Sequence, residues 1–267
     1  MVLLPFYLVG ALAAAAVCFF AAQSGWLLML WALLAFVGGF VTALLLVLLF
    51  LIAVSLCIDR KRPFERRTPF FNFLLRWGFG CLCALARVRP HLAGEALLPE
   101  GRWLLVSNHR SIFDPLVTAW LLGKRQIAFI SKAQNQKIPF AAAYMHALHC
   151  LPLDRENDRA ALKTILTAAD LLRRGVVSFC VYPEGTRNKG EDLLPFRNGA
   201  FKIAQKGQVP IVVARIEGTE RVRRNFPWRH SDVTLRICAV LDTETVLALK
   251  TNEIGEQVRK CLSSAGC

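Results

Sequence analysis

Residues 102–114 read Arg-Trp-Leu-Leu-Val-Ser-Asn-His-Arg-Ser-Ile-Phe-Asp. The run Arg102–Val106 is short and apolar, with the composition of a buried strand. Asp114 is followed by a proline, and aspartate is a favoured N-cap while proline is a favoured first residue of a helix. The stretch therefore predicts a strand, a loop and the start of a helix, with His109 in the loop.

The pair His109 and Asp114 suits acid–base chemistry in this setting. On one continuous helix, residues five apart lie about 140° from each other around the axis, so the two side chains meet only across a strand-to-helix turn. Histidine has an unperturbed pKa of about 6.5 and can take a proton from a hydroxyl if a carboxylate orients the ring. An N-cap aspartate beside a surface histidine is the alternative interpretation, and both can hold.

Beyond this stretch, short apolar runs alternate with segments of helical character. The runs of strand composition are 102–106, 127–130, 176–182, 210–216 and 233–240. The clearest helical pattern spans 155–174 and ends at Gly175, with further candidates at 199–206 and 244–262. This alternation predicts an α/β domain with a mostly parallel central sheet flanked by helices.

The charge is distributed unevenly along the chain. Residues 1–58 contain no Lys, Arg, Asp or Glu, so the net charge of +14 belongs to the remainder of the 267 residues. Residues 3–22 form an apolar run which as a helix would rise about 30 Å, the thickness of the hydrocarbon core. A second apolar run, 26–58, is longer than one span needs and would tilt, or break near Gly38-Gly39. A signal peptide is disfavoured because no basic region precedes the first run.

A basic cluster follows at residues 60–67, and Lys and Arg beside a membrane span predict a cytoplasmic side. Residues 70–89 mix aromatic and aliphatic side chains with three arginines, which is typical of a helix in the membrane interface. An ordinary buried helix is the alternative. The sequence thus predicts an integral membrane protein in three parts: a membrane-spanning segment (1–58), a basic juxtamembrane and interfacial region (59–98) and a cytoplasmic α/β domain (99–267).

A second motif, Pro-Glu-Gly-Thr-Arg at 183–187, follows the apolar run 176–182. In open α/β sheets, ligands bind outside the carboxyl ends of the strands. Thr186 offers a hydroxyl, Gly185 frees backbone amides, and the Arg187 guanidinium can bind a phosphate through two hydrogen bonds. A turn carrying a solvated arginine is the alternative. The motif predicts a phosphate-binding loop.

Taken together, these motifs resemble the glycerolipid acyltransferase family, specifically its 1-acyl-sn-glycerol-3-phosphate acyltransferases. Asn-His-x4-Asp at 108–114 is followed by Pro-Glu-Gly-Thr-Arg at 183–187. Two further blocks match in order: 131–140, which holds a lysine and then Ile-Pro-Phe, and 209–212, which reads Val-Pro-Ile-Val. The resemblance covers roughly residues 99–216 and implies the family's α/β acyltransferase fold.

The resemblance implies a reaction and roles for the motif residues. A fatty acyl group would move from a thioester to the sn-2 hydroxyl of lysophosphatidic acid (1-acyl-sn-glycerol 3-phosphate), forming phosphatidic acid in phospholipid biosynthesis. His109 would be the general base and Asp114 would orient it. The implied substrate-phosphate site comprises Arg187, Lys132, Thr186, Gly185 and Glu184.

A thioester is already activated, so we expect no metal and no other cofactor. The acyl donor would be acyl-CoA or acyl carrier protein. Expected partners are the phospholipid bilayer and lysophosphatidic acid; nucleic acid is not expected, because the basic residues lack aromatic–basic interleaving of an RNA-binding type. The sequence leaves open the donor, the chain length and the oligomeric state.

Three alternatives also remain. Ser107 and Ser111 flank His109, so a covalent acyl-enzyme route competes with direct transfer. The acceptor could be another lysophospholipid or lyso-lipid. A non-catalytic basic membrane-binding protein is the alternative from a different class, and such a protein would not need the His109 and Asp114 pair.

Overall fold

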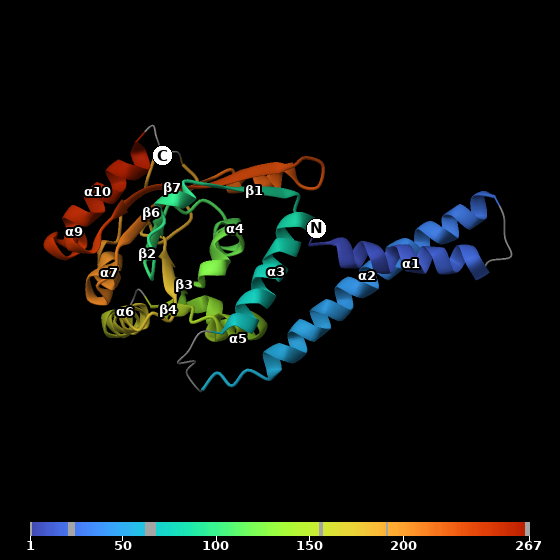
Figure 1. Cartoon of the computed structure of the whole chain (residues 1–267), viewed down its shortest axis with the longest axis horizontal. Coiled ribbons are helices and arrows are strands. Elements are labelled where there is room, and N and C mark those ends of the chain that lie inside the picture. The colour runs from blue at the N-terminus through green and yellow to red at the C-terminus, as the bar shows by residue number, and fades with distance from the viewer. Residues whose placement is uncertain (1, 21–24, 62–67, 155–156, 191, 265–267) are drawn as a thin grey trace. The chain divides into compact units, whose positions relative to one another are not determined.

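The computed structural model describes residues 2–20, 25–61, 68–154, 157–190 and 192–264. The chain divides into two compact units, Met1–Asp59 and Arg60–Cys267. The larger unit is an α/β domain built on one seven-stranded sheet, with helices on both faces (Figure 1). Each unit is described by itself.

The smaller unit consists of two apolar helices, α1 (Leu4–Phe20) and α2 (Trp26–Leu56). They pack against each other, with the rings of Phe6 and Phe40 6.0 Å apart. The helix α2 continues without a break through Gly38-Gly39. Gly39 lets α1 approach closely, because a Cβ there would meet the Gly10 Cα of α1 at 3.2 Å. With 31 residues and no charged side chain, α2 is long and apolar enough to cross a membrane.

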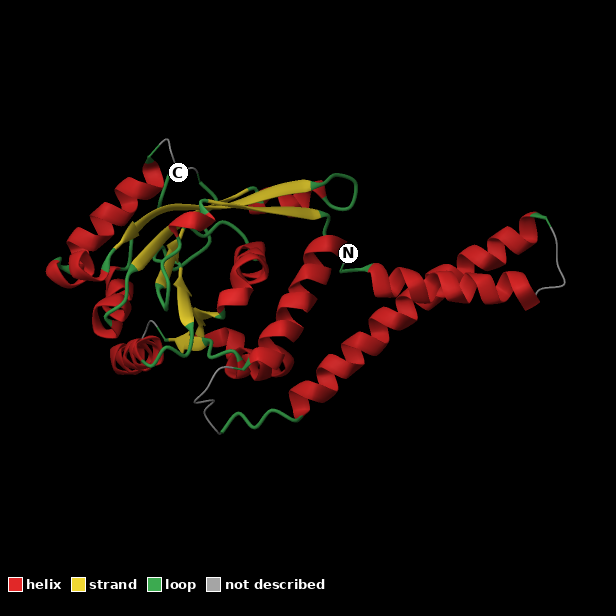
Figure 2. Ribbon diagram, in the orientation of Figure 1, coloured by secondary structure: helices red, strands yellow, loops and turns green. Residues whose placement is uncertain are grey.

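The strands of the sheet, which are yellow in Figure 2, have the order β1-β7-β6-β2-β5-β3-β4. The strands are β1 (Val88–Ala93), β2 (Leu104–Ser107), β3 (Ile127–Lys132), β4 (Leu151–Leu153), β5 (Ser178–Val181), β6 (Ile211–Glu217) and β7 (Ser231–Leu241). Every pair from β6 to β4 is parallel, whereas β7 is antiparallel to β6 and β1 is parallel to β7. The prediction of a mostly parallel sheet flanked by helices is therefore confirmed.

Helices cover both faces of the sheet. They are α3 (Pro69–Leu85), α4 (Phe113–Leu122), α5 (Pro139–Ala147), α6 (Asp158–Arg173), α7 (Lys202–Gly207), α8 (Val222–Asn225), α9 (Thr243–Ala248) and α10 (Thr251–Ser263). Side chains of α6, α7, α9 and α10 share one apolar core, and side chains of α3, α4 and α8 share the other.

The central strand β2 contributes to both cores, since successive side chains of a strand point to opposite faces. Leu104 and Val106 lie in the core beneath α6, whereas Trp103 and Leu105 lie in the core beneath α4. All four residues are fully buried. A strand buried on both faces is a continuous apolar run, which explains why 102–106 shows no alternation.

Candidate active site

Three adjacent parallel strands bring the site together. Val106 of β2 pairs with Val181 of β5 on one side and with Val213 of β6 on the other. The carboxyl ends of the three strands therefore meet at one edge of the sheet, the usual ligand-binding edge of open α/β sheets. The segments that follow them carry the His109 motif, the Glu184 loop and Thr219.

His109 and Asp114 are in direct contact. The His109 Nδ1 lies 2.7 Å from the Asp114 Oδ2, and the aspartate is fully buried while the histidine side chain is 20% exposed. The contact is possible because His109 lies in the turn after β2 and Asp114 in the first turn of α4. With Nδ1 bonded to the carboxylate, the ring's Nε2 is the nitrogen left to exchange a proton with a substrate.

Asp114 does not cap α4 in the usual way. The N-cap residue is Ile112, which makes no side-chain cap. The Asp114 Oδ2 instead reaches back to accept hydrogen bonds from the backbone N–H groups of Arg110 (2.6 Å) and Ser111 (2.8 Å). These bonds fold the turn around the carboxylate, so one side chain fixes both the loop and the histidine.

The second oxygen of Asp114 is held by Thr219, which lies 105 residues later in the chain. The Thr219 hydroxyl donates to Asp114 Oδ1 at 2.5 Å, and both side chains are buried. Gly218 makes this possible: its φ is 91°, and a Cβ there would collide with the carbonyl oxygen of Asp232. Sequence reasoning missed Thr219; the available signal was a Gly-Thr pair directly after a buried strand.

Glu184 joins the two motif loops. Its Oε1 accepts from the His109 backbone N–H at 3.0 Å, and its Oε2 accepts from the Asn188 side-chain amide and the Leu194 backbone N–H, both at 3.0 Å. The Asn188 backbone N–H in turn donates to the His109 carbonyl at 2.7 Å. Glu184 is buried and engaged by these protein donors, which agrees with a role in shaping the loop.

Two further residues support the histidine, and the sequence did not single out either for this role. The ring of Tyr182 stacks on the His109 ring, with centroids 4.3 Å apart and an interplanar angle of 18°. Burial raises the pKa of Tyr182 well above its usual value, so the phenol beneath the histidine stays neutral. Asn108 anchors the start of the motif to β6, since its side-chain amide exchanges two hydrogen bonds with the Ile216 backbone.

A groove of about 1170 Å³ opens beside the pair. Residues 110–113, directly after His109, form one wall, and Thr186–Lys189 form another. The remaining lining is largely apolar and comes from three helices: Leu82 and Leu85 of α3, Leu116 of α4 and Val222 of α8. The groove therefore combines an apolar wall with basic and hydroxyl groups next to the histidine.

The predicted phosphate-binding residues fall into two places. Thr186 and Arg187 are exposed on the groove, after a turn at Gly185 where φ is 72°. Lys132 is exposed at the end of β3 and, within the part of the chain that the structure describes, is not among the residues that line the groove. The fold thus brings Arg187 and Thr186 to the groove beside the histidine motif, and it does not bring Lys132 there.

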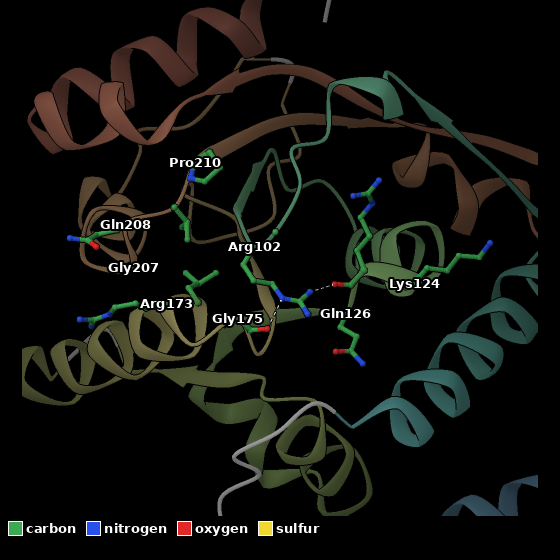
Figure 3. Close-up of a pocket in the computed structure, with 12 residues that line it drawn as sticks. Arg102, Lys124, Gln126, Arg173, Gly175, Gly207, Gln208 and Pro210 are labelled. Atoms are coloured by element: carbon green, nitrogen blue, oxygen red, sulfur yellow. Dashed lines mark hydrogen bonds between the residues drawn. The ribbon is translucent and has the colours of Figure 1, made fainter.

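Another cavity, of about 730 Å³, lies at the opposite, amino-terminal edge of the strands. Its basic residues do not converge on a common point: the Arg102 guanidinium donates to the carbonyls of Gly175 (3.0 Å) and Arg125 (2.6 Å). The side chains of Lys124 and Arg173 extend away from it in opposite directions (Figure 3). Among the described residues, no three His, Cys, Asp or Glu side chains are grouped to hold a metal ion.

Comparison with known proteins agrees with this geometry. Residues 89–217 match the family model described as Acyltransferase. A 1-acyl-sn-glycerol-3-phosphate acyltransferase from Haemophilus influenzae is 28% identical over 191 residues, covering 71% of this chain and 78% of that protein. The Saccharomyces cerevisiae protein of that name is 27% identical over 175 residues, covering 63% of this chain and 56% of the relative.

A solved structure shows the same fold. The crystal structure of the 1-acyl-sn-glycerophosphate (LPA) acyltransferase PlsC from Thermotoga maritima matches with a TM-score of 0.56 at 22% sequence identity, covering 80% of this chain and 84% of that chain. The family match spans β1 to β6 and so includes the histidine turn and the Glu184 loop. On these matches, residues 89–217 form an acyltransferase domain, and the chain is similar to 1-acyl-sn-glycerol-3-phosphate acyltransferases.

Proposed function

We propose that the protein transfers a fatty acyl group from a thioester to the sn-2 hydroxyl of 1-acyl-sn-glycerol 3-phosphate, forming phosphatidic acid. The observation that carries this proposal is the His109–Asp114 pair beside a groove that has both an apolar wall and Arg187. A lysolipid phosphate presents the matching features: an acyl chain, a free hydroxyl and an anionic headgroup.

The reaction follows from the geometry of the pair. His109 Nε2 takes the proton of the acceptor hydroxyl as its oxygen attacks the thioester carbonyl carbon. The carbon–sulfur bond then breaks, and the imidazolium returns the proton to the departing sulfur. Asp114 keeps the Nδ1–H bonded and stabilises the positive charge on the ring during the transfer. The direct route needs no covalent enzyme intermediate.

The positions of the two serines favour direct transfer over an acyl-enzyme. Ser107 is buried, and its hydroxyl donates to the Asn108 side chain at 3.3 Å. The Ser111 hydroxyl accepts from the Phe113 backbone N–H at 3.3 Å. A nucleophilic serine would need its hydroxyl bonded to the histidine, and the hydrogen bonds of both hydroxyls lead to other groups.

Arg187 is proposed to bind the acceptor phosphate, with Thr186 and the amides of the Gly185 turn beside it. Arg187→Ala should raise the KM for lysophosphatidic acid about 10- to 100-fold, because a charge-assisted bond to phosphate is lost, and should lower kcat much less. Arg187→Lys should recover only part of the affinity, since lysine lacks the bidentate fork.

The matched control for this prediction is Arg173→Ala, which removes an exposed arginine of α6 on the other side of the domain. Initial rates at varied acceptor concentration separate the two parameters. An unchanged KM in Arg187→Ala would assign the phosphate to other residues. Lys132 remains a proposed contributor to phosphate binding, and Lys132→Ala in the same assay measures its share.

The function itself is tested by transfer of labelled acyl groups to lysophosphatidic acid, using membranes that contain the full chain. Acyl-CoA and acyl carrier protein thioesters are supplied separately, so the same experiment identifies the donor. Transfer to lysophosphatidic acid supports the proposal. Transfer only to another lysolipid of a panel would keep the chemistry and replace the acceptor, and no transfer to any acceptor would refute the enzyme assignment.

We further propose that the protein is integral to the membrane through residues 1–58, with residues 59–98, whose α3 and β1 belong to the α/β domain, next to the interface, and with residues 99–267 in the cytoplasm. The apolar helix α2 and the basic residues after it support this orientation. Protease added to intact cells or spheroplasts should leave the region after Asp59 undigested, and should digest it once the membrane is permeabilised. Digestion in intact cells would show that the region after Asp59 lies on the opposite side of the membrane.

A further inference from the structure

The loop between α8 and β7 exposes two aromatic side chains to solvent. Trp228 is 86% exposed and Phe226 is 53% exposed. Large aromatic side chains are normally buried in the core or in an interface, because each hides a large apolar area from water. Two of them two residues apart on one loop form an exposed feature that the folding of the domain does not explain.

The base of this loop is held by hydrogen bonds. The Arg229 backbone N–H donates to the Asn225 carbonyl at 2.8 Å. The Asn225 side-chain amide donates to the His230 carbonyl at 3.1 Å and to the Ser231 hydroxyl at 3.0 Å. The Arg87 guanidinium also contacts the His230 ring at 2.8 Å, which ties the loop to the start of β1. The tip of the loop, with Trp228, is therefore held by a hydrogen-bonded turn.

The surroundings of the aromatic tip are basic. Residues 221–230 contain four arginines and no aspartate or glutamate. Arg223, Arg224 and Arg229 are all exposed. Arginine close to exposed tryptophan is typical of surfaces that bind the headgroup region of anionic membranes, where the aromatic ring enters the interface and the cations contact lipid phosphates.

The loop is continuous with the proposed active-site groove. Phe226 and Arg223 line the groove together with Ile112, which is 63% exposed and lies three residues after His109. Leu82 of α3, 51% exposed, lines the same groove. Phe226 therefore belongs both to the groove and to the loop that carries Trp228. Glu220, which also lines the groove, pairs with Arg110 and Arg221.

We propose that the Phe226–Arg229 loop inserts Trp228 into the interface of an anionic phospholipid bilayer and places the mouth of the groove against the lipid surface. The inference rests on the proposed function, because that function explains the use of the contact. An acyl chain could move from the bilayer into the groove without crossing water. The loop contact is separate from the apolar helices α1 and α2, which belong to the other unit of the chain.

The test uses the full chain with the photoreactive residue p-benzoylphenylalanine in place of Trp228. The protein is reconstituted in vesicles of phosphatidylglycerol and phosphatidylcholine that carry a trace of radiolabelled phosphatidylglycerol. Irradiation should link labelled lipid to the protein at position 228. Vesicles of phosphatidylcholine alone, with the label in phosphatidylcholine, should give a signal at least about threefold weaker, because the arginines then have no net anionic surface to bind.

The matched control carries the photoreactive residue at Leu166, an exposed apolar position of α6 on the other face of the sheet. Lipid cross-linking at 228 and not at 166 supports the proposal. Equal signals at both positions, or none at 228, would overturn it. Cross-linking of position 228 to added acidic acyl carrier protein in preference to lipid would also overturn it and would make the loop a protein-docking site.

An activity measurement adds a second readout. Trp228→Ser should lower transfer to lysophosphatidic acid in anionic vesicles about fivefold and leave transfer to detergent-dispersed acceptor nearly unchanged. A loss that is equal in vesicles and detergent would assign Trp228 to folding or catalysis and would overturn the proposal. Cross-linking needs no turnover, so a chain inactive toward lysophosphatidic acid would refute the proposed function while position 228 still decides the membrane contact.

Discussion

His109→Ala should lower kcat for acyl transfer to lysophosphatidic acid by about 10²- to 10⁴-fold, the usual contribution of a general base. The alanine removes the only imidazole that the described structure places on the Asp114 carboxylate, and with it Nε2 as the proton acceptor. Acceptor KM should change little, because the proposed phosphate contact at Arg187 is intact. The measurement is the initial rate in membranes at matched expression.

The control for this prediction is His91→Ala. His91 is also near a carboxylate, at 3.5 Å from Asp232, but it lies on β1 and is well exposed. Its removal should leave the rate within about twofold of wild type, as expected for a surface change. If His109→Ala were as active as His91→Ala, the buried pair would be structural and the proposed mechanism would be wrong.

Asp114→Asn should lower kcat by about 10²- to 10⁴-fold while the protein stays folded. The amide oxygen can still accept from His109, Arg110 and Ser111, and the amide nitrogen can donate to the Thr219 hydroxyl, which is able to accept. The geometry is therefore retained, but no negative charge stabilises the imidazolium. Thermal unfolding measured beside the rate separates loss of charge from loss of fold.

Thr219 offers a second, milder change at the same carboxylate. Thr219→Val removes the hydroxyl and leaves the buried Asp114 Oδ1 without its donor, at a cost of about 1–3 kcal/mol in the free energy of unfolding. Thr219→Ser keeps the donor and should stay close to wild type.

The control for Asp114→Asn is Asp170→Asn, which removes an exposed carboxylate of α6 and should leave the rate unchanged. Full activity in Asp114→Asn would show that the reaction does not need the negative charge of the Asp114 carboxylate.

The sheet was predictable where strands are buried on both faces. The runs 127–130, 176–182 and 210–216 are mostly apolar and overlap β3, β5 and β6. The strand β1 was not predicted, because Val88–Ala93 holds two charged or titratable residues and a proline and lies at the edge of the sheet, where such residues are tolerated. The predicted helix 244–262 is two helices, because the backbone is extended at Leu249 and Lys250, which ends α9 before α10 begins at Thr251.

The sequence by itself determined the chemistry of the site's main residues and their local setting. An apolar strand followed by Asn-His and then by Asp-Pro places a histidine in a turn before a helix, and a carboxylate five residues on can reach it only there. The Gly185 turn carrying Thr186 and Arg187 is local in the same way. These are short-range features, and the residues that form them are neighbours in the chain.

The tertiary structure alone decided which other side chains complete the site. Thr219, Tyr182 and Asn188 are ordinary residues in the sequence, and they meet His109 and Asp114 only because β5 and β6 flank β2 in parallel. The order and register of parallel strands depend on how long-range packing buries apolar surface on both faces of the sheet. No local pattern encodes that packing, so the partners of the His109–Asp114 pair follow only from the assembled sheet.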